Sequence, residues 1–358
     1  MQSKKIKVLI SASGTGGHLI PAQMLSDQLQ KKNITIFFAA KDLSKKKIFA
    51  KEKYLYKDIE SAYPNKNIFS FFYKILKGTL QSIFLILKLK PKIVVGFGSY
   101  HTFPVILASY ILRKKIILFD SNSYLGLTNR VFAKKAKFLA LQFEINKKLK
   151  NIQLVKMLPW IDIKNIDNFE KITKLKKDKF TILIFGGSQG SEIINKNFIK
   201  NLSIFKDKEI QAIHLLGEIK DIVKYKNIYE ENNISSYVTD FEKDMFSLYK
   251  NSSFVISRSG ASTISELIHF EIPSLLIPFS KAKENHQYTN ALFMQNQVKG
   301  SILLEEKDIE SNFIDISKDI FEKNKILFLK ENIKKYKSLI NTQNRKQLSE
   351  IIVDLVNK

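Results

Sequence analysis

Two segments of this chain share one pattern, in which an apolar run leads into closely spaced glycines and then into a helical sequence. The first combines residues 7–11 with Gly14–His18, and the second, about 170 residues later, combines residues 180–185 with Gly186–Gly190. An apolar run that ends in a glycine turn before a helix is typical of a buried strand that feeds a Rossmann-like unit. The repeat therefore predicts an α/β fold with two such halves.

A glycine turn at the start of a helix also has a chemical use. It lets backbone N–H groups approach a phosphate or a sugar closely at the positive end of the helix dipole. Two such turns predict two Rossmann-like, doubly wound domains that face each other across a cleft. This fold can hold a nucleotide-linked donor in one half and an acceptor in the other.

Apolar runs alternate with helical patterns along the chain, which predicts parallel sheets. The runs predict strands over residues 7–11, 35–39, 93–96, 116–120, 181–185, 212–216, 254–257 and 274–278. A chain of 358 residues can form two domains, and we expect them over residues 1–160 and 161–337. The polar stretch 162–179 predicts a linker region, and the end of the chain predicts a helix over 338–358 that packs back on the first domain.

Charge and composition limit the classes of function. The formal net charge is +25, but only four of the 59 basic residues are arginine, and lysine is spread along the whole chain. Nucleic-acid-binding proteins concentrate these cations on one element, so we expect no nucleic-acid partner. The diffuse charge favours anionic partners such as acidic lipid headgroups and pyrophosphates. The absence of cysteine excludes disulfides and thiolate metal sites, and the lack of a secretory signal before the first strand predicts a cytoplasmic location.

The segment over residues 68–90 is strongly apolar but is interrupted by lysines and Gly78, which argues against a transmembrane span. Apolar residues that include Phe72, Leu76 and Leu80 fall on one helical face. One interpretation is a core helix, or a pair of helices, that covers a sheet. The other is an apolar patch ringed by lysines that lies in a membrane interface. Both hold if opposite faces of the helix serve the two purposes.

The first glycine turn differs from a nicotinamide-dinucleotide motif. Its third glycine falls at residue 17 and no acidic residue closes the second strand, so an oxidoreductase is disfavoured. His18 lies where the first helix begins, and we expect the helix dipole to lower the pKa of its imidazole. A neutral imidazole at this place can act as a general base. The alternative is a structural histidine that bonds the backbone of the turn.

A third combination of strand, turn and helix covers residues 255–267, with Arg258 at the end of the strand. The backbone N–H groups of Ser262 and Thr263 would face a diphosphate at the start of this helix. Glu266 comes about one and a half turns into the helix. A carboxylate at that place can accept hydrogen bonds from both hydroxyls of a ribose.

This block has a simpler alternative interpretation. Ser259 would cap the helix, and Glu266 would lie on a solvated face. Further along the chain, Asn285, His286 and Gln287 offer amide and imidazole groups after a predicted strand. Such groups suit the hydroxyls of a sugar, so this segment is a second candidate for donor contacts.

The order of these blocks resembles the MurG family of N-acetylglucosaminyltransferases. The matching segments are Gly14–His18 with Pro21-Ala22, Val95–Tyr100 with Pro104, Asn122 with Gly126–Arg130, Gly186–Gly190, Arg258–Glu266, and His286-Gln287. The resemblance extends from about residue 5 to residue 300. It implies the GT-B fold, in which the N-terminal half faces the acceptor and the membrane and the C-terminal half binds most of the UDP-sugar.

The resemblance also implies an activity. The family transfers GlcNAc from UDP-GlcNAc to the C4 hydroxyl of the muramyl sugar of lipid I, an undecaprenyl pyrophosphate, with inversion at the anomeric carbon. The product is lipid II, which is used in peptidoglycan synthesis. The implied partners are UDP-GlcNAc, lipid I and an anionic membrane surface, and the implied location is the cytoplasmic face of the bacterial cell membrane.

Inverting transfer needs a base for the acceptor hydroxyl and stabilisation of the departing diphosphate. We assign the base to His18, with Asp120 as the alternative. No Asp-x-Asp cluster ends a strand, so we expect no metal and no cofactor, and the N-termini of helices would stabilise the diphosphate. The residues expected to contact the substrates are Thr15, Gly16, Gly17, Tyr100, Asn122, Asn129, Ser188, Gln189, Glu242, Arg258, Ala261, Ser262, Thr263, Glu266, His286 and Gln287.

The chain departs from the family pattern at three places. It has Phe119–Asn122 where the family usually has His-Glu-Gln-Asn, Ser99 where the family has the second glycine of Gly-Gly-Tyr, and Ile161 where an arginine near the uracil is expected. Two other functions therefore stay open. Another GT-B glycolipid transferase with a different UDP-sugar or acceptor predicts transfer to diacylglycerol or lipid A precursors. A non-catalytic UDP-sugar-binding protein predicts binding without turnover.

Overall fold

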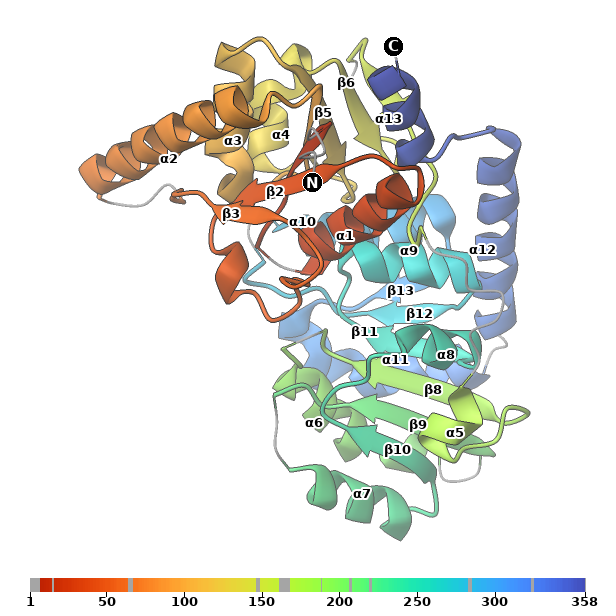
Figure 1. Ribbon diagram of the computed structural model, residues 1–358. Coiled ribbons are helices and arrows are strands. Elements are labelled where there is room, and N and C mark those ends of the chain that lie inside the picture. The colour runs from red at the N-terminus through yellow and green to blue at the C-terminus, as the bar shows by residue number, and fades with distance from the viewer. Residues whose placement is uncertain are drawn as a thin grey trace. The chain divides into compact units, whose positions relative to one another are not determined.

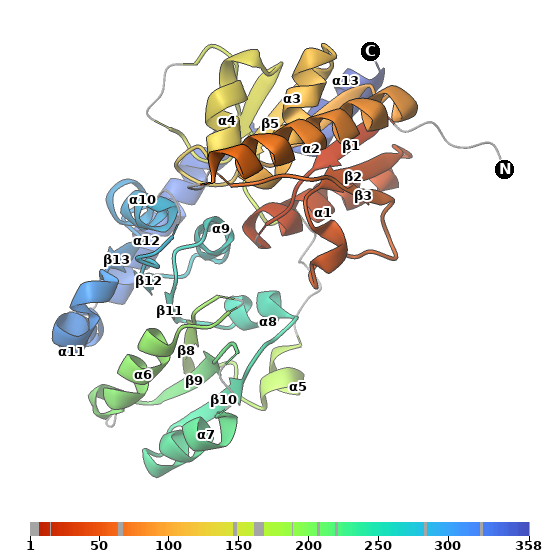
Figure 2. The same cartoon turned by 90° about the vertical axis from the view of Figure 1, so that its left-hand side faces the viewer.

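The chain divides into two compact α/β units, each with one parallel sheet (Figure 1 and Figure 2). Unit 1 comprises residues 1–161 together with 345–358, and unit 2 comprises residues 162–344. The computed structural model describes residues 7–14, 16–63, 67–145, 149–160, 168–187, 189–205, 208–218, 221–282, 285–322 and 325–357.

Unit 1 is built on a seven-stranded sheet in the order β3-β2-β1-β4-β5-β6-β7. Its strands are β1 (Val8–Ser11), β2 (Ile36–Ala40), β3 (Tyr56–Asp58), β4 (Ile93–Gly96), β5 (Lys115–Asp120), β6 (Phe138–Leu141) and β7 (Ile152–Leu154). Its helices are α1 (Gly16–Lys31), α2 (Ile68–Leu89), α3 (Phe103–Ile111), α4 (Leu127–Phe132) and α13 (Leu348–Asn357), with short 3₁₀ turns at Leu43–Lys45, Tyr100–Thr102 and Ala133–Lys135.

Side chains alternate along each strand, so the two faces of this sheet carry separate cores. One face, which includes Ile10 and Val95, packs against α1 and α13. The opposite face, which includes Leu9 and Val94, packs against α2, α3 and α4. Figure 1 shows α2 and α3 grouped on the side away from α13. The continuous apolar runs of the sequence follow from this double coverage.

Unit 2 has a six-stranded sheet in the order β10-β9-β8-β11-β12-β13. Its strands are β8 (Phe180–Phe185), β9 (Ile210–Leu215), β10 (Ser235–Thr239), β11 (Phe254–Ser257), β12 (Ser274–Leu276) and β13 (Ser301–Leu303). Its helices are α5 (Phe169–Thr173), α6 (Glu192–Lys200), α7 (Ile222–Glu231), α8 (Met245–Lys250), α9 (Ala261–Phe270), α10 (His286–Phe293), α11 (Ile309–Glu322) and α12 (Lys325–Thr342), with short turns at Leu202–Phe205, Met294–Val298 and Glu306–Asp308. One core of this unit joins α6, α7 and α11 to the sheet.

The strand order of each unit has a reversal, between β1 and β4 in unit 1 and between β8 and β11 in unit 2. Loops that leave the two strands at a reversal turn to opposite faces of the sheet and leave room for a ligand between them. The glycine turns of the sequence follow β1 and β8. At each reversal the neighbouring strand, β4 or β11, leads into another of the matching blocks, whereas the blocks at Asn122 and His286 follow β5 and β12. The fold therefore places these motifs in pairs, one pair in each unit.

The predicted strands are confirmed, with ends that differ from the prediction by at most two residues. Five strands were not predicted, namely β3, β6, β7, β10 and β13. Three of them, β3, β7 and β13, have only three residues each, which is too short for an alternating pattern to be recognised. β10 begins with two serines, which weakens its apolar pattern.

Two predictions about the connections between domains are corrected. The stretch 162–179 is more than a linker, because within its described part α5 belongs to unit 2 and Phe169 is fully buried there. The end of the chain packs on the first domain as expected, but the single helix over 338–358 is wrong. α12 ends at Thr342, Asn344 takes a left-handed φ of 47°, and α13 forms a separate helix in unit 1 that packs against α1. A left-handed residue interrupts the helical hydrogen-bond pattern.

The helix α2 has two different apolar faces. Leu85 and Ile86 are buried in the core that covers the sheet, whereas Phe69, Phe72 and Phe84 are 90%, 64% and 71% exposed. Among the described residues, α2 is the one helix long and apolar enough to cross a membrane by length and composition. Because α2 also packs along α3, we interpret it as a surface helix of unit 1. The interpretation of residues 68–90 as a core helix is confirmed for the buried face, and contact of the exposed face with a membrane stays a prediction.

The contact of α2 with the rest of unit 1 depends on Gly78. A Cβ atom at this position would lie 1.8 Å from the carbonyl oxygen of Glu60. We expect Gly78→Ala to lower the stability of the protein by about 2 kcal/mol, because the clash outweighs the gain of about 1 kcal/mol in helix propensity. Thermal unfolding checks this, with the exposed Lys77→Ala as control. Equal unfolding midpoints for the two variants would contradict it.

Candidate active site

Three loops of unit 1 meet beside the glycine turn that follows β1. The Ser13 hydroxyl donates to the carbonyl oxygen of Lys41 at 2.6 Å, and the Lys41 N–H donates to the carbonyl oxygen of His101 at 3.4 Å. The loop after β4 contains Ser99, which has a φ of 67°. The Thr128 hydroxyl donates to the carbonyl oxygen of Ser99 at 2.7 Å. These bonds fix the loops around the N-terminus of α1, whose first N–H groups have no acceptor within the helix.

Asp120, at the end of β5, organises the loop that leads to α4. One carboxylate oxygen accepts the backbone N–H and the side-chain amide of Asn122 at 3.1 and 3.2 Å. The other accepts the N–H of Gly126 and the amide of Asn129, both at 2.9 Å. Asp120 is buried, so these four donors surround it. This arrangement favours a role in holding the loop over a role as proton acceptor.

His18 lies in the first turn of α1 and is half-buried. A Cβ atom on Gly98 would lie 3.8 Å from Cε1 of its imidazole, so the ring approaches the loop after β4. The Ser121 hydroxyl donates to the carbonyl oxygen of Gly17 at 3.3 Å, which joins the loop after β5 to the same turn. The structure therefore brings the turn that carries His18 together with the loops after β4 and β5.

Phe119, where the resemblance implies a histidine, occupies a core position. The Phe119 side chain is 1% exposed. Its ring packs against those of Phe97 and Trp160, with centroid distances of 5.2 and 5.0 Å. The substitution therefore adds an aromatic contact to the core of unit 1, while Asp120 beside it keeps its place in the loop.

In unit 2, the glycine turn after β8 packs backbone against backbone on the loop after β9. A Cβ atom on Gly190 would lie 2.3 Å from the carbonyl oxygen of Leu216, and one on Gly217 would lie 2.2 Å from Cα of Gly190. Both glycines take positive φ angles, of 77° and 74°. Gly187 has open space at its Cβ position, and Gln189 is exposed. The turn is thus fixed on one side and accessible on the other.

Arg258, which follows β11, joins three loops of unit 2. Its guanidinium donates to the carbonyl oxygens of Ile277 and Pro278, both at 3.2 Å, and to the Ser191 hydroxyl at 2.7 Å. It also forms an ion pair with Glu306 at 2.5 Å. Arg258 is 8% exposed, and its bonds end within the protein. Arg258 therefore positions the glycine turn and the end of β12.

Glu266, on α9, is half-buried beside the buried hydroxyl of Tyr249. Burial raises the pKa of the Glu266 carboxyl from 4.5 to about 7, and a hydrogen bond from Tyr249 opposes this rise. The alternative that Glu266 lies on a solvated face is therefore wrong. A carboxyl held in this way is a strong acceptor when it ionises, because few solvent molecules compete for it.

The helix α9 begins at Ala261 after Gly260, which has no side chain to cap it. The N–H groups of Ala261, Ser262 and Thr263 belong to its first turn, where helices have no internal acceptors. The alternative that Ser259 caps this helix is wrong. The Ser259 hydroxyl instead donates to the carbonyl oxygen of Gln287, in the first turn of α10, at 2.8 Å. The N-terminus of α9 is therefore available to an anion.

Two other predicted donor contacts hold loops of unit 2. The side-chain oxygen of Gln287 accepts the N–H of Phe279 at 3.0 Å. Glu242 accepts the Tyr237 hydroxyl at 3.0 Å and the N–H of Asp244 at 2.9 Å, in the loop after β10. His286 begins α10 and is half-buried. These side chains shape the loops at the strand ends, as Arg258 does.

The structure thus groups the predicted residues into two sets. The set of unit 1 lies on the loops that follow β1, β4 and β5, and comprises Gly16, Gly17, His18, Tyr100, Asp120, Asn122 and Asn129. The set of unit 2 comprises Gln189, Glu242, Arg258, Ala261, Ser262, Thr263, Glu266, His286 and Gln287. Thr15, Ser188 and Ile161 lie outside the described residues. Within the described ranges, no three His, Cys, Asp or Glu side chains form a group that could hold a metal ion.

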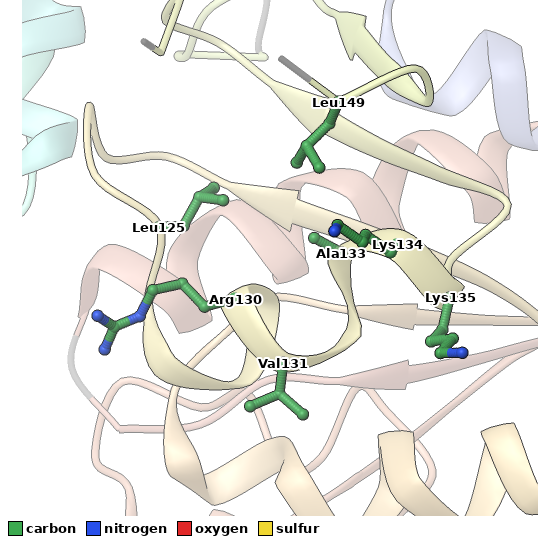
Figure 3. Close-up of a pocket in the computed structure, with 7 residues that line it drawn as sticks. All are labelled: Leu125, Arg130, Val131, Ala133, Lys134, Lys135 and Leu149. Carbon is green, nitrogen blue, oxygen red and sulfur yellow. The ribbon is translucent and has the colours of Figure 1, made fainter. Parts of the chain in front are cut away.

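A groove of about 400 Å³ lies on unit 1 beside α4 (Figure 3). Its lining consists of Leu125, Arg130, Val131, Ala133, Lys134, Lys135 and Leu149. Figure 3 shows the three cationic side chains on α4 and the turn that follows it, with Leu149 opposite. The Lys135 ammonium lies 5.7 Å from the centre of the Tyr110 ring of α3. The groove therefore combines apolar walls with positive charge.

Comparisons with known proteins identify the family. The Glycosyltransferase family 28 N-terminal domain matches residues 8–140, and the Glycosyltransferase family 28 C-terminal domain matches residues 181–349. A protein of Protochlamydia amoebophila (strain UWE25) is 38% identical over 84% of this chain and 84% of its own length, and one of Rickettsia bellii (strain RML369-C) is 33% identical over 98% and 99%. Both are named UDP-N-acetylglucosamine–N-acetylmuramyl-(pentapeptide) pyrophosphoryl-undecaprenol N-acetylglucosamine transferase.

The chain belongs to the MurG family of glycosyltransferases. The crystal structure of Acinetobacter baumannii MurG shares its fold, with a TM-score of 0.75 and 21% identity over 98% of this chain and 99% of that one. The calicheamicin glycosyltransferase CalG4 shares the fold at a TM-score of 0.71 and 11% identity, over 99% and 98%. The expected α/β class with two Rossmann-like domains of the GT-B type is thereby confirmed.

Sequence reasoning missed several residues that shape the site of this MurG-family chain. Glu306 forms an ion pair with Arg258, and Tyr249 bonds Glu266. Glu306 is 48 residues from Arg258, and no local pattern links the two. His101 follows the quoted Tyr100 directly, and its position after a buried strand was an available signal.

The raised pKa of Glu266 has a consequence for stability. A carboxyl whose folded pKa exceeds its unfolded value stabilises the protein at low pH, and this contribution is lost as the pH rises from about 4.5 through about 7. We therefore expect the unfolding midpoint of Glu266→Gln, relative to the unchanged protein, to rise by several degrees between about pH 5 and about pH 8. Thermal unfolding at both pH values measures this. A constant difference would contradict it.

Proposed function

We infer that this chain transfers GlcNAc from UDP-GlcNAc to the C4 hydroxyl of the muramyl sugar of lipid I, with inversion at the anomeric carbon, and so makes lipid II for peptidoglycan. The observation that carries this conclusion is the match of both halves to one family whose relatives, at up to 38% identity over most of their length, bear that activity in their names. Through peptidoglycan synthesis the chain would also serve cell shape and division.

The donor is bound by unit 2 in this proposal. The N–H groups of Ala261, Ser262 and Thr263 bind the diphosphate at the N-terminus of α9 and stabilise its charge as the sugar leaves. Glu266 accepts the hydroxyls of the ribose when it is ionised. Arg258 holds the glycine turn and the end of β12 in place, which fixes the loops around the donor.

The acceptor is bound by unit 1, at the glycine turn and the loops after β4 and β5. His18 removes the proton of the C4 hydroxyl as its oxygen attacks the anomeric carbon. The bond from that carbon to the diphosphate breaks, and UDP leaves with the bonding electrons. Asp120 is the weaker candidate for the base, because four donors from the protein already occupy its oxygens.

The direct test is a transfer assay with the purified chain, UDP-GlcNAc and a short-chain lipid I analogue, with and without EDTA. We expect equal amounts of UDP and lipid-linked disaccharide, and the same rate in EDTA. Binding of UDP-GlcNAc without turnover would contradict the proposed activity in favour of a non-catalytic binding protein. Turnover only with diacylglycerol or a lipid A precursor would indicate a different glycolipid transferase.

The same assay separates the two candidate bases. We expect His18→Ala to lower kcat by about 10²–10⁴-fold, the usual effect of losing a general base, with the KM for UDP-GlcNAc preserved. Asp120→Ala should act through the loop, with a raised KM for the acceptor and a lower unfolding midpoint. The assignment is wrong if Asp120→Ala loses more kcat than His18→Ala at an unchanged unfolding midpoint.

We also propose that the chain binds peripherally to the cytoplasmic face of the bacterial cell membrane, through α2. The exposed Phe69, Phe72 and Phe84 offer an apolar face on unit 1, and a helix of this kind lies in the headgroup region of a bilayer. Lysines on α2 and the cations of the groove beside α4 add attraction to anionic lipids. The net charge of +25 acts in the same direction.

Vesicle sedimentation tests this surface. Charging two of its aromatic residues, in Phe72→Asp with Phe84→Asp, removes apolar area and adds repulsion. We expect binding to vesicles that contain anionic phospholipid to fall about tenfold or more. The matched control is Val223→Asp on α7, which is 71% exposed in unit 2 and should bind as before. Equal binding of both variants would contradict the proposal that α2 is the membrane-binding surface.

A further inference from the structure

His101 lies in the wall of the unit 1 glycine turn, and no role has been assigned to it so far. It belongs to the short turn Tyr100–Thr102 after β4 and is 9% exposed. A Cβ atom on Gly14 would lie 3.2 Å from Cδ2 and 3.6 Å from Nε2 of the imidazole. The Tyr100 ring stacks on the imidazole at a centroid distance of 4.0 Å, which fixes the plane of the ring.

The two nitrogens of this imidazole have different surroundings. Nδ1 is buried and has no hydrogen-bond partner in the part of the chain that the structure describes. Buried polar atoms without partners are rare in proteins and call for an explanation. Because Nδ1 has no acceptor for a proton, the neutral ring keeps its proton on Nε2, the nitrogen nearer to Gly14. His101 therefore presents an N–H donor to the turn.

The imidazole is neutral near pH 7, and the positive charges around it favour this form. Burial lowers the pKa of His101 to about 4, assisted by the charges of Lys46, Lys41 and His18 and opposed by Asp42. The same lysines and the N-terminus of the 16-residue helix α1 attract an anion to this place. A rigid, neutral donor beside such an N-terminus suits an oxygen of a phosphate group.

We propose that Nε2–H of His101 donates a hydrogen bond to the pyrophosphate of the lipid acceptor, bound at the N-terminus of α1. The proposal rests on the proposed function, and it adds a binding residue that the family motifs in this chain do not include. The Tyr100 ring and the Lys41 N–H, which donates to the His101 carbonyl oxygen, hold the donor in position. The contact selects acceptors that carry a phosphate close to the sugar.

Transfer kinetics with the short-chain lipid I analogue test this contact in His101→Leu and His101→Gln. Loss of a hydrogen bond to a charged group weakens binding by about tenfold or more. We expect His101→Leu to raise the KM for the analogue by that factor and to leave the KM for UDP-GlcNAc unchanged. Geranyl pyrophosphate, which has no sugar, should lose inhibitory potency by the same factor. His101→Gln, whose amide N–H can replace Nε2–H, should stay close to the unchanged protein.

A matched control separates binding from stability. Tyr54→Phe removes a hydrogen bond to Asp27 within unit 1, and we expect it to lower the unfolding midpoint without changing either KM. If His101→Leu does not fold, His101→Asn takes its place, because its shorter amide should not reach the phosphate. An unchanged KM for the analogue, equal rises in both KM values, or unchanged inhibition by geranyl pyrophosphate would overturn the proposal. Absence of transfer by the unchanged protein would instead contradict the proposed function.

Discussion

Close approach of one backbone to another at the glycine turn after β8 is the constraint on which the half-site of unit 2 depends. In unit 2, Gly190 and Gly217 stand so close that a methyl group on either would overlap the other loop. Only glycine tolerates this contact together with a positive φ. Backbone contacts therefore fix one side of the turn, Arg258 holds it through Ser191, and the N-terminus of α9 keeps its N–H groups for a ligand. The glycines, the strand order and the helix N-terminus therefore act together at this turn.

The charged side chains around these turns mostly act on the protein itself. Asp120 uses both carboxylate oxygens to hold the loop after β5, and Arg258 uses its guanidinium to join the glycine turn, the end of β12 and Glu306. Removing one partner of such a buried network is costly, because the other partner keeps its charge without compensation. If mutation of Asp120 or Arg258 lowers the activity, we therefore expect the main cause to be a change in the geometry of the loops.

The Glu266 carboxylate differs from Asp120 and Arg258, because its charged form lowers the stability of the free protein. Its burial makes the ionised form costly in the free protein, since the pKa rises to about 7. In the proposed complex the ribose hydroxyls would supply the hydrogen bonds that water no longer provides. A site that is strained in this way gains more from its ligand than a solvated carboxylate does. His101, which is also buried with an unpartnered nitrogen, fits the same description in unit 1.

The sequence by itself determined the fold class, eight of the thirteen strands in the described residues and the blocks that mark the family, because buried strands and glycine turns leave local patterns. It could not find the three-residue edge strands, which are too short for periodicity, or the separation of α12 from α13, which depends on one left-handed residue at Asn344. Only the tertiary structure decided that Arg258 binds Glu306, that Phe119 belongs to the core and that Glu266 is desolvated. These contacts join residues that are separated along the chain, and local sequence patterns do not indicate which separated residues meet.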